Sequence, residues 1–176
     1  MLAECALAAA LLAVTAPLAI PLGPIPLSLA TAVLCLIGML LSPLCALASV
    51  AVYLVLGAIG LPIFSGFGAG VGVLIGPSGG FLLGYPLCVL SVSIASRLAR
   101  DRGRRGTVLW RLFGALFGLA LLYALGVLWY AEVAGVSFLA ALAVSALPFL
   151  PFEIPKLALA LLLAPRLRLA LARIEK

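Results

Sequence analysis

The sequence predicts an all-α integral membrane protein with six transmembrane helices, and three observations lead to this fold class. Of the 176 residues, 66% are hydrophobic and only 9% are charged, whereas a soluble domain carries about 25% charged residues. The mean hydropathy is +1.39. Apolar segments recur at lengths close to the roughly 20 residues that cross a bilayer as a helix. A soluble packed core is excluded, because the apolar surface exceeds what a chain of this size can bury.

The apolar segments follow one another along the chain, and turn-forming residues separate them. Breaks at Pro21-Leu22-Gly23-Pro24, Ser42-Pro43 and Leu61-Pro62 support the divisions. The first segment is interpreted as a span rather than a signal peptide, because Glu4 stands where a basic n-region is expected. The second segment is short, so it must be tilted, lie in a thinned bilayer or have misplaced ends. The six predicted spans are Leu2–Leu18, Leu27–Leu41, Leu44–Gly60, Gly80–Leu98, Val108–Tyr130 and Ile154–Leu171.

Two basic clusters predict the orientation of the spans. One flanks the connection between the fourth and fifth spans, and the other forms the C-terminal end. Because Lys and Arg concentrate in cytoplasmic loops, both clusters are expected to be cytoplasmic. With six spans, the N-terminus is then expected on the cytoplasmic side as well. We interpret these residues as a topology signal rather than as a nucleic-acid surface. The clusters are Arg97, Arg100, Arg102, Arg104, Arg105 and Arg111, and Arg166, Arg168, Arg173 and Lys176. The outer connections are then Ile20–Pro26, Leu61–Gly79 and Ala131–Pro151.

The segment FEIPK contains Glu153 and Lys156 at the outer end of the sixth span. A charge at the centre of a membrane helix costs about 2.5–3.5 kcal/mol, so such residues usually have a partner or a task. Pro155 suits the first turn of a helix, which predicts a helix start near Glu153. The helix dipole and the ammonium of Lys156 would together favour a carboxylate, and Glu153 could accept hydrogen bonds from an N–H-bearing ligand. Alternatively, the two residues pair with each other and anchor the helix.

The segment Leu61–Tyr85 is rich in glycine, and Gly68, Gly72, Gly76, Gly80 and Gly84 recur every four residues. It contains neither of the glycine-rich nucleotide-binding motifs. If helical, these glycines form a smooth packing face; if irregular, they form a cap over a pocket that is shielded from lipid. A break is expected at Pro77-Ser78-Gly79-Gly80. The rings of Phe64, Phe67, Phe81 and Tyr85 either contact a ligand or simply pack.

Small residues at helical spacing predict two contact faces. Ala6 with Ala10 and Ala9 with Ala13 form such pairs on the first span, and Gly114-x-x-x-Gly118 forms one on the fifth. The four cysteines have no metal-type spacing and are interpreted as small apolar packing residues. The chain has no histidine, which removes histidine-based metal sites and general bases. The cysteines are Cys5, Cys35, Cys45 and Cys88.

Three parts of the sequence together resemble one family. The run GAIGLPIFSGFGAGVGVLIGPSGGFLLGY, Gly57–Tyr85, is similar to the signature of the BioY family, the biotin-binding S components of energy-coupling factor transporters. IPLGPIPLSLAT, Ile20–Thr31, resembles the family's first outer loop and second span. LPFLPFEIPKLALALLLA, Leu147–Ala164, resembles its P-F-x-P-G-D-x-x-K segment. The resemblance implies six transmembrane helices with a pocket near the outer face, capped by the glycine-rich loop.

The resemblance also implies a function. The chain is expected to be a single substrate-binding domain, residues 1–176, in a bacterial-type cell membrane, and not an enzyme. It is expected to take up biotin with a transmembrane coupling subunit and two ATPase subunits, needing no cofactor and using ATP only through these partners. By resemblance, Glu153 and Lys156 contact biotin. The motif that forms the pocket or lid includes Gly76, Ser78, Gly80, Phe81 and Tyr85. The surface that docks on the coupling subunit is formed by Ala6, Ala9, Ala10 and Ala13.

Four residues depart from the family pattern. Glu153 stands where the family usually has Asp, and Phe152 stands where it has Gly. Pro155 takes the place of a plain apolar residue, and Ala30 takes the place of a common Gln. The longer carboxyl side chain adds one methylene to a tight site. These departures leave open how biotin is held and which of its groups meets Glu153 or Lys156.

Other functions remain as alternatives. The chain could be an S component for a different vitamin, which a ligand panel would decide. An intramembrane enzyme acting on lipid would need a nucleophile or an acid–base pair, and only Glu132, Glu153, Lys156 and scattered hydroxyls are present. A purely structural membrane protein predicts that replacing Lys156 lowers stability without any effect on ligand binding.

Overall fold

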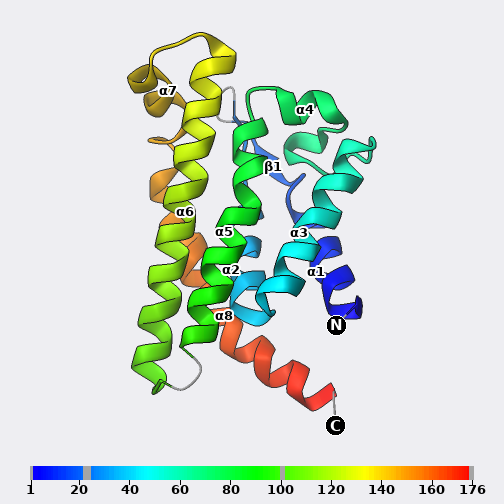
Figure 1. The fold of residues 1–176 in the computed structure, drawn as a ribbon, viewed down its shortest axis with the longest axis vertical. Helices are drawn as coiled ribbons and strands as arrows, with labels where there is room; N and C mark the ends of the chain where they lie inside the picture. Colours follow the sequence, from blue (N-terminus) through cyan, green and yellow to red (C-terminus); the bar gives the residue numbers. More distant parts are fainter. Residues whose placement is uncertain (1, 22–24, 100–101, 175–176) are drawn as a thin grey trace.

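The computed structural model describes residues 2–21, 25–99 and 102–174, and it is almost entirely helical. The helices form an elongated bundle, with α4 and α7 at one end and both chain termini at the other (Figure 1). The elements are α1 (Leu2–Thr15), β1 (Ala19–Ile20), β2 (Leu27–Ser28), α2 (Ala30–Leu40), α3 (Pro43–Ala58), the 3-10 helix η1 (Ser65–Phe67), α4 (Val71–Ile75), α5 (Gly79–Leu98), α6 (Arg104–Ala134), α7 (Phe138–Ser145) and α8 (Leu150–Ile174).

Helix length alone does not confirm six spans. In the described part of the chain, α5 and residues 105–134 of α6 are long and apolar enough to cross a membrane, and α7 with α8 forms a third candidate that is bent by 52°. Helices α1, α2 and α3 are apolar but have only 14, 11 and 16 residues. The predicted first span is followed by β1, the predicted second span begins with β2, and these two short strands pair antiparallel.

Two predicted boundaries in the last third of the chain are wrong. The sixth helix begins at Leu150, not near Glu153, so Pro155 lies inside α8 and Lys156 lies beyond its first turn. The outer connection predicted at Ala131–Pro151 contains the last turn of α6 and all of α7. Gly135, with a φ of 65°, ends α6 in the left-handed conformation.

Part of the predicted basic clusters falls on residues that are not described. Arg100 and Lys176 lie outside the described residues, as do the side chains of Arg104 and Arg173, and the predicted break at Pro21-Leu22-Gly23-Pro24 is described only at Pro21. The first turn of α6 lies at the same end of the bundle as both termini (Figure 1). This is the arrangement that an even number of crossings requires.

Glycines bring α5 and α6 into close contact. A Cβ added at Gly118 of α6 would lie 2.8 Å from the carbonyl oxygen of Cys88 on α5, and one at Gly114 would overlap the side chain of Ala95. The predicted contact face at Gly114 and Gly118 is therefore confirmed. Gly84 contributes from the α5 side, where an added Cβ would lie 3.0 Å from the Cα of Leu122.

The glycine-rich segment combines the two predicted alternatives. Its first part, through Gly76, is irregular apart from η1 and the short α4, with φ of 83° at Gly70. Its second part begins α5 at Gly79, which confirms the predicted break. Beneath the irregular part, the ring of Phe64 occupies the space that a side chain at Gly57 would need.

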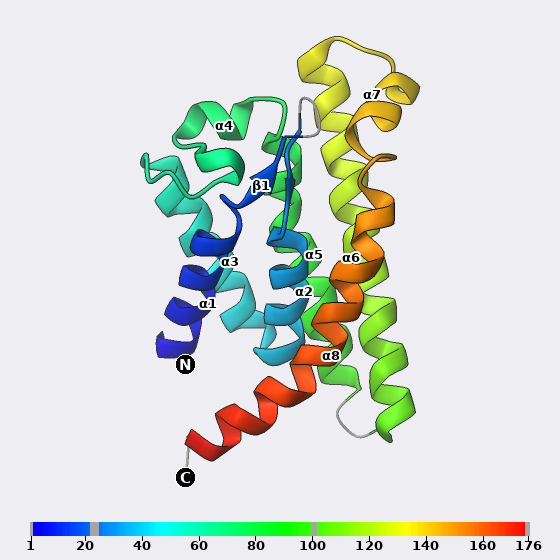
Figure 2. The same ribbon diagram turned by 180° about the vertical axis from the view of Figure 1, so that it is seen from behind.

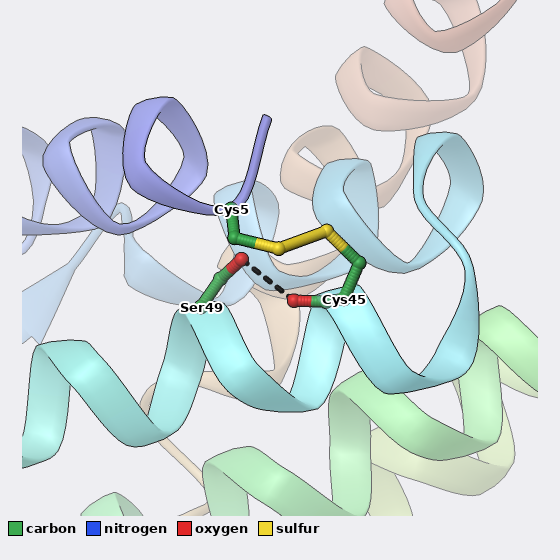
Figure 3. The surroundings of a disulfide bond; sticks show 3 residues. All are labelled: Cys5, Cys45 and Ser49. Carbon is green, nitrogen blue, oxygen red and sulfur yellow. Dashed lines mark hydrogen bonds between the residues drawn. A yellow bond between two sulfur atoms is a disulfide. The ribbon is translucent and has the colours of Figure 1, made fainter. Parts of the chain in front are cut away.

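The prediction that all four cysteines are isolated packing residues is wrong for two of them. A disulfide joins Cys5 of α1 to Cys45 of α3, with 5.6 Å between their Cα atoms (Figure 3). The Ser49 hydroxyl donates a hydrogen bond of 2.8 Å to the carbonyl of Cys45. Cys35 and Cys88 are free and buried. Sequence spacing misses this bond because its geometry depends on how two helices pack, not on their separation in the chain.

The four alanines of α1 do not share one face. Ala6 and Ala10 are exposed, whereas Ala9 is 4% exposed and packs inward. Ala13 is half-buried against the main hydrophobic core. The surface that α1 can offer to another protein therefore includes Ala6 and Ala10 but not Ala9.

Candidate functional site

A cavity lies between the glycine-rich segment and the first turns of α8. It contains about 560 Å³ of empty space, part of which is open to solvent. Every element from β2 to α8 except α3 contributes to its wall. The lining residues are Ile25, Pro26, Leu27, Ser28, Thr31, Phe64, Ser65, Val73, Ser78, Phe81, Leu82, Tyr85, Leu122, Tyr123, Ser145, Phe149, Glu153 and Lys156.

Glu153 and Lys156 form the centre of a buried polar cluster in this wall. The Nζ atom of Lys156 donates to Oε1 of Glu153 at 2.8 Å. The hydroxyls of Thr31 and Tyr123 both donate to the same oxygen at 3.1 Å. Lys156 also donates to the Thr31 hydroxyl at 3.2 Å. Three helices, α2, α6 and α8, thus meet at a single carboxylate oxygen.

The cluster explains how two charges can remain inside an apolar bundle. Glu153 is 7% exposed and Lys156 is 8% exposed, so each would be costly alone. Paired and hydrogen-bonded, they leave no net charge. Lys156 lies beyond the first turn of α8, and Glu153 balances its charge. In this structure the two residues therefore pair with each other, which is the alternative that the sequence left open.

The cluster nevertheless keeps capacity for a ligand. An ammonium has three N–H donors, and the described residues accept two of those of Lys156. The described residues give no hydrogen bond to Oε2 of Glu153, since all three donors use Oε1. One donor and one acceptor therefore remain side by side in the cavity wall.

Aromatic rings form much of the remaining wall. Phe81 meets Tyr123 edge to face, with ring centroids 5.8 Å apart. Phe64 packs in the same manner against Tyr53, at 5.6 Å, and Tyr53 stacks on Tyr85 at 6.3 Å. Tyr53 is held from behind, because its hydroxyl donates to the carbonyl of Ile63 at 3.1 Å. This fixed aromatic framework suits an apolar ring system.

The structure brings five of the seven predicted binding residues to the cavity. Ser78, Phe81, Tyr85, Glu153 and Lys156 line it together. Gly76 and Gly80 are not among its lining residues. The carbonyl of Gly76 accepts a hydrogen bond of 3.0 Å from Trp129 Nε1, and a Cβ at Gly80 would lie 2.8 Å from the carbonyl of Leu125. These two glycines hold the start of α5 against α6.

Sequence reasoning did not single out Thr31 and Tyr123, although both touch Glu153. Each was detectable in principle as a hydroxyl within an apolar stretch: Thr31 lies in the run LATAVLCL of the second predicted span, and Tyr123 lies in the middle of the fifth. In the described part of the chain, no three side chains of the kinds that bind metals come together.

The chain is similar to known proteins of one family. The model of the BioY family matches residues 1–173. A probable biotin transporter BioY of Pyrococcus horikoshii is 34% identical over 163 residues, which cover 93% of each chain. The biotin transporter BioY of Thermotoga maritima is 36% identical over 162 residues, with 90% of each chain covered.

A solved structure has the same fold. The crystal structure of the S-component for biotin from an ECF-type ABC transporter superposes with a TM-score of 0.83 at 27% sequence identity. The superposition covers 95% of this chain and 89% of that one. These relatives are multi-pass membrane transporter components and not enzymes. The family match, the curated relatives and the shared fold together establish that the chain belongs to the BioY family.

Proposed function

We propose that this chain is the biotin-binding S component of an energy-coupling factor transporter and that biotin occupies the cavity lined by Glu153 and Lys156. The observation that carries the proposal is the pairing of an unused donor and an unused acceptor within an aromatic-lined cavity. Biotin matches both features. Its ureido group has two N–H donors and one carbonyl acceptor, and its sulfur-containing ring is apolar.

Charge balance assigns the ureido group to the polar cluster. Glu153 and Lys156 already neutralise each other at 2.8 Å. A ligand carboxylate placed there would add an uncompensated negative charge to a buried site, whereas a neutral ureido group adds none. In this arrangement Oε2 of Glu153 accepts from a ureido N–H and Lys156 donates to the ureido carbonyl.

The valerate carboxylate then lies in another part of the cavity. The hydroxyls of Ser28, Ser65 and Ser78 line the same cavity, and a hydroxyl can donate to a carboxylate oxygen. Ser78 directly precedes α5, a 20-residue helix whose N-terminal end favours a negative charge. Phe81 and Tyr85, on the following turns, contact the ring system.

The proposed topology has six transmembrane segments in one domain, residues 1–176, with both termini and the arginine-rich connection in the cytoplasm. The grouping of the termini and the start of α6 at one end of the bundle supports it (Figure 2). The cavity is then near the outer face, beneath the glycine-rich segment. The chain has no ATP-binding motif, so uptake relies on a transmembrane coupling subunit and two ATPase subunits. The exposed face of α1 with Ala6 and Ala10 is the proposed docking surface.

Calorimetric titration of the purified protein with biotin and with the neutral biotin amide tests this proposal. Glu153→Gln and Lys156→Met should each weaken both ligands by about 10- to 100-fold, because each removes one charge-assisted hydrogen bond. Glu132→Gln, the same chemical change at a residue that does not line the cavity, should have no effect.

Two other outcomes would contradict parts of the proposal. If Lys156→Met weakened biotin but not the amide, the carboxylate and not the ureido group would lie at the cluster. If the wild-type protein bound a different vitamin and not biotin, the ligand would be wrong while the S-component assignment remained.

A further inference from the structure

Arg111 is a buried cation for which the described residues supply no partner. It lies on α6 and is 6% exposed. None of the described residues forms a hydrogen bond or an ion pair with it, and its Nε atom is buried with no partner. Among the described residues, Arg168 of α8 adds a positive charge to its surroundings. A buried charge is normally compensated by an opposite charge, as Lys156 is by Glu153.

A large cavity adjoins this arginine. It lies between the first turns of α6 and the last turns of α8, with about 1,170 Å³ of empty space that is partly open to the outside. In Figure 2, α8 diverges from α6 toward its C-terminal end. Val108, Leu161, Leu162 and Leu169 give the cavity apolar walls, and the guanidinium-bearing Arg166 lines it together with Arg111.

The neighbouring aromatic residue indicates the depth of this cavity in a membrane. Trp110 directly precedes Arg111, and the guanidinium of Arg102 lies 4.8 Å from the centre of its ring. Tryptophan concentrates at the boundary between hydrocarbon and lipid headgroups. The cavity therefore combines two cations at headgroup depth with apolar walls that extend toward the hydrocarbon.

We propose that this cavity binds an anionic phospholipid of the leaflet at the arginine-rich end. The lipid phosphate pairs with Arg111 and Arg166, and an acyl chain lies along Leu161, Leu162 and Leu169. The charge complementarity favours an anionic headgroup, and the apolar walls favour a lipid over free phosphate. This site is separate from the Glu153–Lys156 cavity, since α8 lines that cavity with Glu153 and Lys156 and this one only with residues from Leu161 onward.

Lipid retention by the full-length protein tests the proposal. The protein in a neutral detergent is titrated with phosphatidylglycerol, with phosphatidylcholine of the same acyl chains, or with inorganic phosphate. Native mass spectrometry counts the retained lipid, and thermal unfolding reports stabilisation. Phosphatidylglycerol should bind and raise the Tm by several degrees, and the other two should not. Arg111→Gln should weaken phosphatidylglycerol binding about tenfold or more, which is the loss expected for one charge-assisted contact.

Arg105→Gln is the matched control, because Arg105 is an exposed arginine on the same helix. It should retain the lipid as the wild type does, and biotin binding should be unchanged in both variants. Unaltered lipid binding by Arg111→Gln, or equal binding of phosphatidylcholine, would overturn the proposal. So would an equal Tm shift with inorganic phosphate alone, which would identify the ligand as a free anion. If Arg111→Gln does not fold, the proposal is tested by the binding of the three ligands to the wild type and by the loss of phosphatidylglycerol binding in Arg166→Gln.

Discussion

Separating the charges of the Glu153–Lys156 pair should cost more stability than removing both. Lys156→Met leaves the Glu153 carboxylate buried, with hydrogen bonds from Thr31 and Tyr123 but no counter-charge. Glu153→Gln likewise leaves the Lys156 ammonium buried without a counter-charge. Breaking a buried ion pair in this manner costs about 3–5 kcal/mol. For a chain of this size, about 2–4 °C of Tm accompanies each kcal/mol. Each single variant should therefore unfold about 6–20 °C below the wild type.

The double variant gives the decisive measurement. Glu153→Gln with Lys156→Met removes both charges while the amide can still accept hydrogen bonds from Thr31 and Tyr123. Because replacing a buried ion pair by neutral groups is often close to neutral, we expect its stability to return to within about 1 kcal/mol of the wild type. Thermal unfolding of the four proteins in one detergent measures this cycle. If the double variant lost the sum of the two single losses, the pair would not be coupled and the reasoning would be refuted. Biotin binding should remain weak in all three variants.

Two further perturbations test the framework around the cavity. Gly57→Ala should lower stability by about 1–3 kcal/mol and weaken biotin binding, because the added methyl group displaces the buried ring of Phe64. Thermal unfolding and calorimetric titration measure these two effects. Gly72→Ala is the control that should leave stability and biotin binding unchanged, because an added Cβ there meets nothing within 4 Å. Cys5→Ser should cost about 4 kcal/mol, since the disulfide with Cys45 closes a loop with a sequence separation of 40. A reductant should lower the Tm of the wild type to that of the variant, and a Tm unaffected by reductant would contradict this prediction.

The sequence indicated the centre of the candidate site because charged residues are conspicuous in an apolar chain. Glu153 and Lys156 were identifiable for that reason, and Phe81 and Tyr85 through the family resemblance. Thr31 was not identified, because a hydroxyl is inexpensive in a helix and becomes important only when α2 packs against α8. The disulfide and the inward orientation of Ala9 depend likewise on the packing of α1 against α3. Helix α7 was not predicted, because its eight residues are too few for a span and lie within the stretch Ala131–Pro151 that was predicted to be an outer connection.

The shape of α2 has a consequence for membrane insertion. Its 11 residues span only about 16 Å, roughly half the hydrocarbon thickness, and Ala30–Met39 are all buried within the protein. A helix of this length would leave its terminal backbone groups in hydrocarbon if it entered the bilayer alone. We therefore expect α2 to remain in the translocon until α1 and α3 flank it, so that the three helices integrate as one unit. Placed alone in a reporter protein, the segment should be translocated rather than retained, and efficient integration of the isolated segment would contradict this order of assembly.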